Sequence, residues 1–83
     1  MVKMMRFVKS PTKTSLKAFC DVAVEDRIVI RGIRVVEGRH GPFISMPRQK
    51  SGKGDWHDSV VCIDKTLQAE LRRLVLDAYY NDQ

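Results

Sequence analysis

The sequence lacks the features that mark several large classes of protein. Its 83 residues include only 2 cysteines, both inside apolar stretches, so no disulfide framework is expected. No apolar run approaches the roughly 20 residues that cross a bilayer. The basic N-terminal stretch has neither an apolar signal core nor a small-residue cleavage site. We therefore expect a cytoplasmic protein with no membrane partner, made of a single domain over residues 1–83.

Signatures of catalysis and of cofactor binding are also missing. The 5 glycines form neither a Walker A loop nor a G-x-G-x-x-G turn. His57 lies between Asp55 and Asp58, which suggests a metal site or an acid–base pair, but the paired close spacings typical of structural zinc are absent. So small a domain also has little room for a pocket of roughly 300 Å³ or more. We expect no enzymatic activity, no cofactor, no metal and no small-molecule substrate.

Positive charge is plentiful and unevenly distributed. Residues 1–53 hold 12 Lys/Arg against 4 Asp/Glu, whereas residues 54–83 hold 3 against 6. This asymmetry favours a polyanionic partner, and nucleic acid ahead of a membrane surface because no long basic amphipathic helix is present. That inference requires the basic side chains of the first 53 residues to gather into one continuous surface. The alternative is a basic protein whose charge serves only solubility.

Alternation with a period of two predicts an antiparallel sheet. Residues 15–24 place Ala18, Cys20 and Val22 on one face, with Lys17 and Phe19 on the other. A tight hairpin turn is expected at Glu25-Asp26. Further strand patterns cover residues 3–9, 27–38, 42–47 and 55–63.

Gly32 interrupts the alternation within residues 27–38, and one inserted glycine is typical of a β-bulge. Arg27, Arg31 and Arg34 then share the polar face in a row, with Lys17 nearby. Charges stacked along one sheet face are costly unless water or an anion covers them. The arginine row is therefore a secondary candidate for phosphate contacts.

After residue 63 the period changes to that of a helix. Asp64 is a candidate N-cap, and nothing breaks the pattern before Asn81. One apolar stripe is formed by Leu67, Leu71, Leu74, Val75 and Ala78. The opposite face carries Lys65, Gln68, Arg72 and Arg73. The predicted fold is α+β, an antiparallel sheet of four to five strands with a C-terminal helix packed on one face.

The segment between the last two predicted strands, "PRQKSGKGDW", combines charge, glycine and the single Trp. Arg48, Lys50 and Lys53 stand within six residues, and the intervening glycines let the backbone approach a surface closely. This pattern suits phosphate contacts, but it also suits a solvated loop. Trp56 either packs on the sheet as a hydrophobic anchor or stacks on an unpaired base.

Two motifs resemble those of a known family. "IRVVEG" precedes "GPFISMP", which fits a G-x-F-[IV]-x-M-P signature, and "DWHD" and the closing helix follow. Over about residues 3–80 the chain is similar to the stage V sporulation protein G (SpoVG) family of small bacterial regulators. The resemblance implies a non-enzymatic α+β protein that dimerises by joining strands of two subunits. It also implies binding to DNA, and in some members RNA, with effects on sporulation and septation.

The family's contacts lie in the helix region and the segment before it. Carried over to this sequence, the resemblance implies nucleic-acid contacts at Arg48, Lys50, Lys53, Lys65, Thr66, Arg72 and Arg73. The leading hypothesis is thus a homodimeric nucleic-acid-binding regulator. A second hypothesis uses the same basic surface for an acidic protein partner in cell division. An edge strand at residues 3–9 or 42–47 would serve dimerisation in either case.

Overall fold

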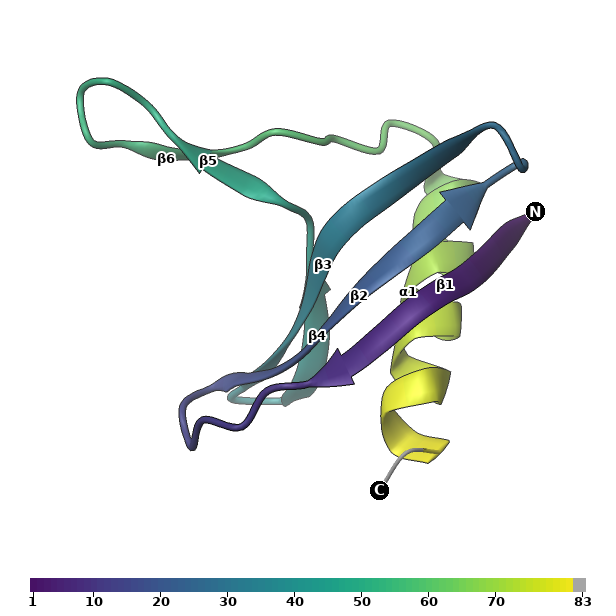
Figure 1. The fold of residues 1–83 in the computed structure, drawn as a ribbon, viewed down its shortest axis with the longest axis horizontal. Helices are drawn as coiled ribbons and strands as arrows, with labels where there is room; N and C mark the ends of the chain where they lie inside the picture. Colours follow the sequence, from purple (N-terminus) through teal and green to yellow (C-terminus); the bar gives the residue numbers. More distant parts are fainter. Residues whose placement is uncertain (82–83) are drawn as a thin grey trace.

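A computed structural model describes residues 1–81 as a four-stranded sheet, a projecting hairpin and a C-terminal helix (Figure 1). The main sheet is antiparallel, with strands in chain order. Its strands are β1 (Val2–Lys9), β2 (Leu16–Val24), β3 (Ile28–Gly38) and β4 (Gly41–Ser45). A separate two-stranded sheet is formed by β5 (Arg48–Lys50) and β6 (Trp56–Asp58), and the chain closes with α1 (Lys65–Asn81). The predicted α+β fold is confirmed.

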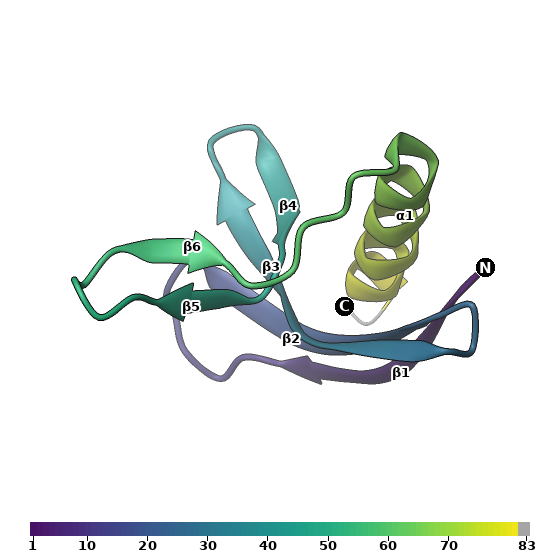
Figure 2. The ribbon, with the colours of Figure 1, turned by 90° about the horizontal axis from the view of Figure 1, so that it is seen from above.

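The hydrophobic core lies between one face of the main sheet and the apolar stripe of α1. Ala18, Cys20 and Val22 on β2 are almost completely buried, as are Leu71 and Val75 on the helix. The helix covers one face of the sheet, and the described chain leaves the other face bare (Figure 2). Both predicted periodicities are therefore correct, because each selects the face that meets the other element. Tyr79, which the sequence analysis did not assign to the stripe, extends the core by one more turn.

Asp64 caps the helix as predicted. Its carboxylate Oδ1 accepts a hydrogen bond from the backbone N–H of Thr66 at 3.3 Å, and its carbonyl accepts one from Gln68 at 2.9 Å. The first bond satisfies a donor that has no partner within the helix. The described helix runs to Asn81.

The hairpin turn between β2 and β3 also lies where the sequence predicts it. Glu25 and Asp26 have φ angles of 55° and 56°, and the N–H of Arg27 donates to the carbonyl of Val24 at 3.0 Å. Positive φ at both central residues is the type I′ geometry, whose twist matches that of the flanking strands. Glu25 also pairs with the N-terminal amine of Met1, which ties β1 to the turn.

Gly32 forms the predicted β-bulge. The register between β2 and β3 shifts there, because Cys20 faces Ile33 while Asp21 faces Arg31. Gly32 has a φ of +85°, and its N–H donates to Oδ1 of Asp21 at 3.1 Å. In a regular strand, residues 31 and 34 would point to opposite faces. The extra residue places both arginines on the face away from the helix.

The strand predicted over residues 55–63 is wrong in its length, since β6 ends at Asp58. The strand predicted over residues 42–47 also ends early, at Ser45. Beyond it the chain leaves the main sheet at Pro47, which has no N–H to donate to a ladder. β5 and β6 then pair only with each other. The chain that follows β6 therefore pairs with no strand of the main sheet. Within residues 59–81, only Ser59 donates hydrogen bonds to the carbonyl of Pro47.

The strand order defines the two edges of the main sheet. These edges are β1 and β4, which contain residues 3–9 and most of residues 42–47, the two segments suggested for dimerisation.

Across residues 1–81, no helix has both the length and the apolar character that a bilayer crossing needs.

Replacing Leu71 by Ala tests the helix–sheet core. Leu71 is completely buried, and truncating such a side chain costs the transfer free energy of the lost methyl groups plus a cavity term. We expect the free energy of unfolding to fall by about 3 kcal/mol in a urea titration. The exposed Lys65→Ala substitution on the same helix should change it by less than about 0.5 kcal/mol. Equal effects would contradict the assignment of Leu71 to the core.

Thiol labelling tests the same core chemically. Burial raises the pKa of the Cys20 thiol to about 11, with the Asp21 carboxylate adding to the shift, and the residue is only 2% exposed. Cys20 should thus remain a protonated thiol at neutral pH, unreactive until the protein unfolds. Cys62 is half-buried. A maleimide should therefore label one thiol in the native protein and two in urea. Rapid labelling of a native Cys62→Ala variant would contradict this placement.

Candidate nucleic-acid interface

The β5–β6 hairpin projects from the body of the molecule (Figure 1). Arg48 pairs with Asp58, Gln49 with His57 and Lys50 with Trp56. All six residues are exposed. Nothing in the described chain covers this hairpin, which is the position expected of a contact element.

Ser51 organises the loop at the tip of the hairpin. Its hydroxyl accepts hydrogen bonds from the backbone N–H groups of Lys53 at 3.3 Å and Asp55 at 3.2 Å. Its carbonyl accepts one from the N–H of Gly54 at 3.0 Å. Gly54 has a φ of +89°, the left-handed conformation that closes a three-residue hairpin loop. The loop therefore has a defined shape that presents the Lys53 side chain to solvent.

The positive charge of residues 48–53 is partly offset by a carboxylate on β6. Arg48 Nε lies 3.4 Å from Oδ1 of Asp58, so part of its charge is neutralised across the hairpin. Lys50 and Lys53 have no carboxylate within ion-pair distance among residues 1–81. These two lysines carry the uncompensated positive charge of the hairpin.

Trp56 does not serve as an anchor in the core. Its side chain is 58% exposed, and it lies beside Lys50 in the hairpin ladder. The packing alternative is therefore wrong for the described chain. The exposed indole therefore lies next to the Lys50 position on the hairpin.

Arg31 and Arg34 lie on the bare face of the main sheet. Arg31 is exposed and paired in register with Asp21, whereas Arg34 is half-buried and paired with Phe19 on one side and Ser45 on the other. Nη2 of Arg34 donates to Oγ of Ser45 at 3.3 Å, which fixes the guanidinium across β4. Arg27 belongs to the turn before β3 rather than to the strand. Two arginines of the expected row thus remain within the sheet.

The helix candidates form a third group. Lys65, Thr66, Arg72 and Arg73 are all exposed, and Arg73 Nε lies 4.0 Å from a carboxylate oxygen of Asp77. The Thr66 backbone N–H is already occupied by the helix cap. Lys65 and Arg72 carry no ion pair within residues 1–81.

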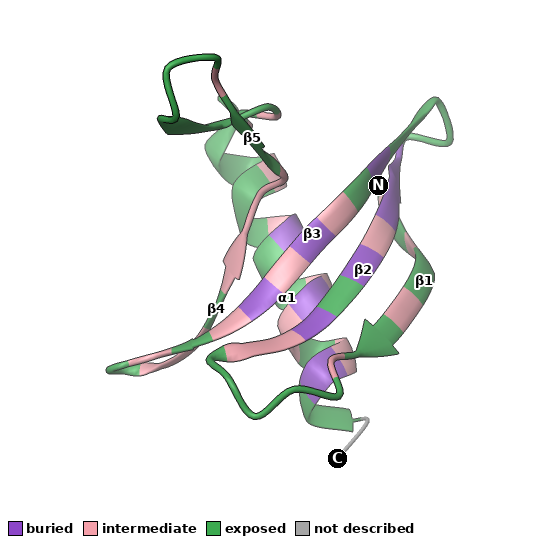
Figure 3. Ribbon diagram, turned by 60° about the vertical axis from the view of Figure 1, so that its left-hand side comes forward, coloured by how far each residue is buried: buried purple, intermediate pink, exposed green. Residues whose placement is uncertain are grey.

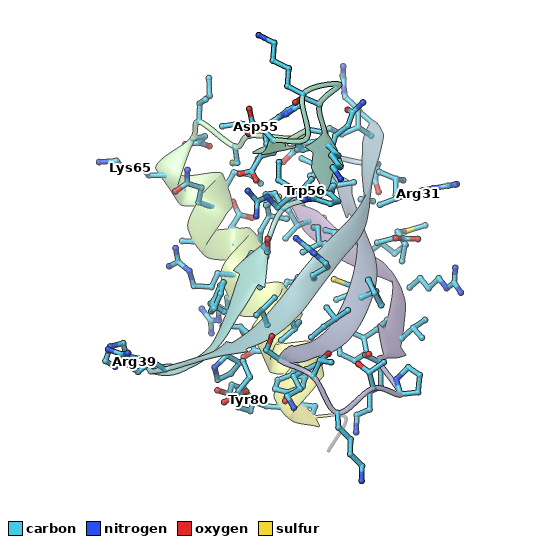
Figure 4. All side chains as sticks on the ribbon, turned by 90° about the vertical axis from the view of Figure 1, so that its left-hand side faces the viewer. Arg31, Arg39, Asp55, Trp56, Lys65 and Tyr80 are labelled. Atoms are coloured by element: carbon cyan, nitrogen blue, oxygen red, sulfur yellow. The ribbon has the colours of Figure 1, made fainter. Side chains whose placement is uncertain are left out.

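The candidate residues thus occupy three surfaces: the hairpin, the bare sheet face and the outer side of α1. Figure 4 shows Arg31 and Lys65 pointing to opposite sides of the molecule. Arg39, at the β3–β4 turn, extends away from both the hairpin and Arg31 (Figure 4). Basic side chains of the first 53 residues therefore do not form a single continuous patch within one chain.

Exposed apolar side chains are the features that sequence reasoning missed. Val61 is 69% exposed and Ile63 92% exposed, in the segment that connects the hairpin to the helix. On the bare sheet face, Phe19 and Phe43 are 40% and 49% exposed. The alternation that placed Phe19 opposite the core side chains was the available signal.

An open cleft of about 370 Å³ lies between β4, the connecting segment and α1. Its lining includes Phe43, Met46, Asp58, Val61 and Arg72. It is larger than so short a chain led us to expect. Among residues 1–81, no three His, Cys, Asp or Glu side chains converge to hold a metal ion.

Comparison with known proteins places this architecture in a family. The sequence pattern of the SpoVG family matches residues 1–81. A protein of Lachnospira eligens named as a SpoVG septation protein is 32% identical over 75 residues, which cover 90% of this chain and 85% of the relative. A Clostridium perfringens protein of the same name is 32% identical over 90% of this chain and 83% of its own length. One from Desulforudis audaxviator is 33% identical over 77% and 73%. The chain belongs to the SpoVG family.

Proposed function

We propose that this chain is a homodimeric nucleic-acid-binding regulator that acts without catalysis in the cytoplasm. The observation that carries the proposal is the exposed β5–β6 hairpin, with Lys50 and Lys53 uncompensated and Trp56 beside them. Phosphates attract such lysines with little dependence on base sequence. Arg48, Arg72 and Lys65 add contacts of the same kind. Relatives named as septation proteins support a role linked to septation and sporulation.

The ligand in this proposal is DNA, with RNA as a second polyanion that meets the same lysines. Each Lys or Arg that neutralises a duplex phosphate adds about 0.9 to the slope of log K against log salt. The described helix α1 is covered on one side by the sheet, and its exposed side carries Lys65, Arg72 and Arg73. These residues suit phosphate contacts rather than a code for base edges.

Replacing Lys50 and Lys53 together by Ala tests the hairpin. We expect the salt slope for duplex DNA to fall by about 2 units for each hairpin of the dimer that contacts the duplex, since each phosphate that a lysine neutralises contributes about 0.9. Including Arg48→Ala should add less than a full unit, because Asp58 already shares its charge. A filter-binding titration at several salt concentrations measures the slope.

The matched control removes two positive charges elsewhere. Lys13→Ala with Arg27→Ala changes the turns that flank β2 and leaves the hairpin intact. This variant should keep the wild-type slope to within about half a unit. If control and hairpin variants lose equal slope, a diffuse charge effect explains the binding and the hairpin contact is wrong.

Dimerisation has its support in the connecting segment. Val61 and Ile63 are large apolar side chains that are mostly exposed to solvent. Together with Ile28 and Leu67 they line a groove of about 220 Å³. A chain of 83 residues buries little of its own surface. A second copy that covers this segment, together with an edge strand, supplies the missing burial.

Sedimentation at micromolar concentration tests the dimer. We expect the wild type to sediment as a dimer and Ile63→Asp to sediment as a monomer, because a carboxylate in an apolar interface is costly to desolvate. Tyr80→Asp, at an exposed position near the end of α1 and on neither edge strand, is the control and should remain a dimer. A monomeric wild type would contradict the proposal.

The rival function, binding of an acidic protein partner in cell division, predicts a different purification result. Nucleic acid that copurifies with the protein and is removed by nuclease supports our proposal. Protein that is free of nucleic acid and retains one acidic partner supports the rival.

A further inference from the structure

The bare face of the main sheet carries an unusual set of side chains for a surface without a described neighbour. Figure 3 shows this face with α1 behind it, and on β2 one exposed position lies between two buried ones. Phe19 is 40% exposed, although its neighbours Ala18 and Cys20 are almost completely buried. Phe19 is thus a true surface residue and not a poorly covered part of the core.

Strand register brings aromatic and cationic side chains together on this face. Val8, Phe19, Arg34 and Ser45 form one continuous row across all four strands. Phe43 lies two residues from Ser45 on β4, opposite Val36, and so points to the same side. Arg34 is therefore paired with Phe19 on β2 and hydrogen-bonded to Ser45 on β4, and Phe43 lies diagonally across from it on the same face.

The Phe43 ring packs against a glycine on the neighbouring strand. A Cβ atom on Gly38 would lie 2.8 Å from Cε1 of Phe43, which is closer than carbon atoms approach. The ring therefore packs against the Cα of Gly38 and occupies the space that a side chain at position 38 would need. Its other surface is open to solvent. The exposed side of the ring is available for a planar partner to stack on.

The neighbouring row supplies charge and hydrogen-bonding groups. Arg6, Asp21 and Arg31 lie side by side on β1, β2 and β3. The bulge already engages Asp21, whose Oδ1 accepts the N–H of Gly32. Beside Phe19 lies a shallow hollow of about 210 Å³ whose rim includes Arg6 and Asp21. It thus has an aromatic wall, a hydrogen-bond donor and an acceptor.

We propose that this face binds unpaired nucleotides, with bases stacked on Phe19 and Phe43 and phosphates on Arg31 and Arg34. The inference rests on the proposed nucleic-acid function and adds a second site of different selectivity. Stacking requires a free base face, which a duplex does not offer, whereas phosphate contacts at the hairpin accept either form. The two rows contain three arginines and one aspartate. This excess of positive charge favours a polyanionic ligand over an apolar protein surface. The site therefore makes the protein prefer single strands when both surfaces are engaged.

The test compares a labelled single-stranded oligothymidylate with a duplex of equal length by fluorescence anisotropy. The Phe19→Leu/Phe43→Leu variant keeps apolar bulk on the face but removes both rings. We expect its single-strand affinity to fall about tenfold or more, since stacking on each aromatic contributes substantially. Duplex affinity should remain within about twofold of the wild type. Met5→Leu with Val29→Leu, on other exposed apolar positions of the described sheet, is the matched control and should change neither.

Two further variants keep the test decisive if the double variant unfolds. Gly38→Ala displaces the Phe43 ring and should weaken single-strand binding alone. Arg34→Gln keeps a polar amide at this position but removes the charge, and should do the same. Thermal unfolding midpoints identify any variant whose loss comes from misfolding.

The outcomes separate this inference from the function on which it rests. If Lys50→Ala/Lys53→Ala weakens duplex binding while the sheet variants bind single strands like the wild type, the hairpin function stands and the sheet site is wrong. If the wild type binds neither nucleic acid, both fail. If the phenylalanine variants become monomers while the wild type is a dimer, the face is covered by a second copy, which also overturns the inference.

Discussion

One helix can cover only one face of a four-stranded sheet, and most of the surface of this protein follows from that constraint. The apolar stripe around Leu71 and Val75 occupies the face formed by Ala18, Cys20 and Val22. Burial on that side is the main favourable term that the described chain supplies. The opposite face must therefore present side chains that tolerate water, although it still carries Phe19 and Phe43. Surfaces of this composition are where partners are found.

The Gly32 bulge connects this core to the charge on the bare face. Without the extra residue, the alternation that buries Ile30 would place Ile33 on the bare face and turn Arg34 toward the helix. The inserted glycine lets Ile30, Ile33 and Val35 all reach the core, while Arg31 and Arg34 remain outside. A charged guanidinium in the core would be very costly unless paired. The bulge is thus required by the core and determines the bare face at the same time.

Much of the fold could be predicted from the sequence because it depends on local pattern. The alternation of residues 15–24, the Glu25-Asp26 turn, the Gly32 bulge and the Asp64 cap are all set by neighbours in the chain. The course of residues 46–64 depended instead on which strand the chain would meet after Pro47, and local pattern does not contain that information. The pairing of Arg48 with Asp58 follows from hairpin register, so the net charge of the loop was overestimated. Exposure of Trp56 depends on the same register.

The separation of basic groups has a consequence for how such a protein would read nucleic acid. In the proposed function, the hairpin with two uncompensated lysines binds phosphates wherever they lie, so its contribution is general and sensitive to salt. In our proposal, the sheet face with its exposed aromatic rings responds to whether bases are free, which is a different property of the ligand. These two surfaces lie on different elements, so mutation or a second copy can affect one and leave the other intact. In this proposal, the preference for single-stranded or duplex ligands depends on how much each of the two surfaces contributes to the binding free energy. No single residue has to read a base sequence.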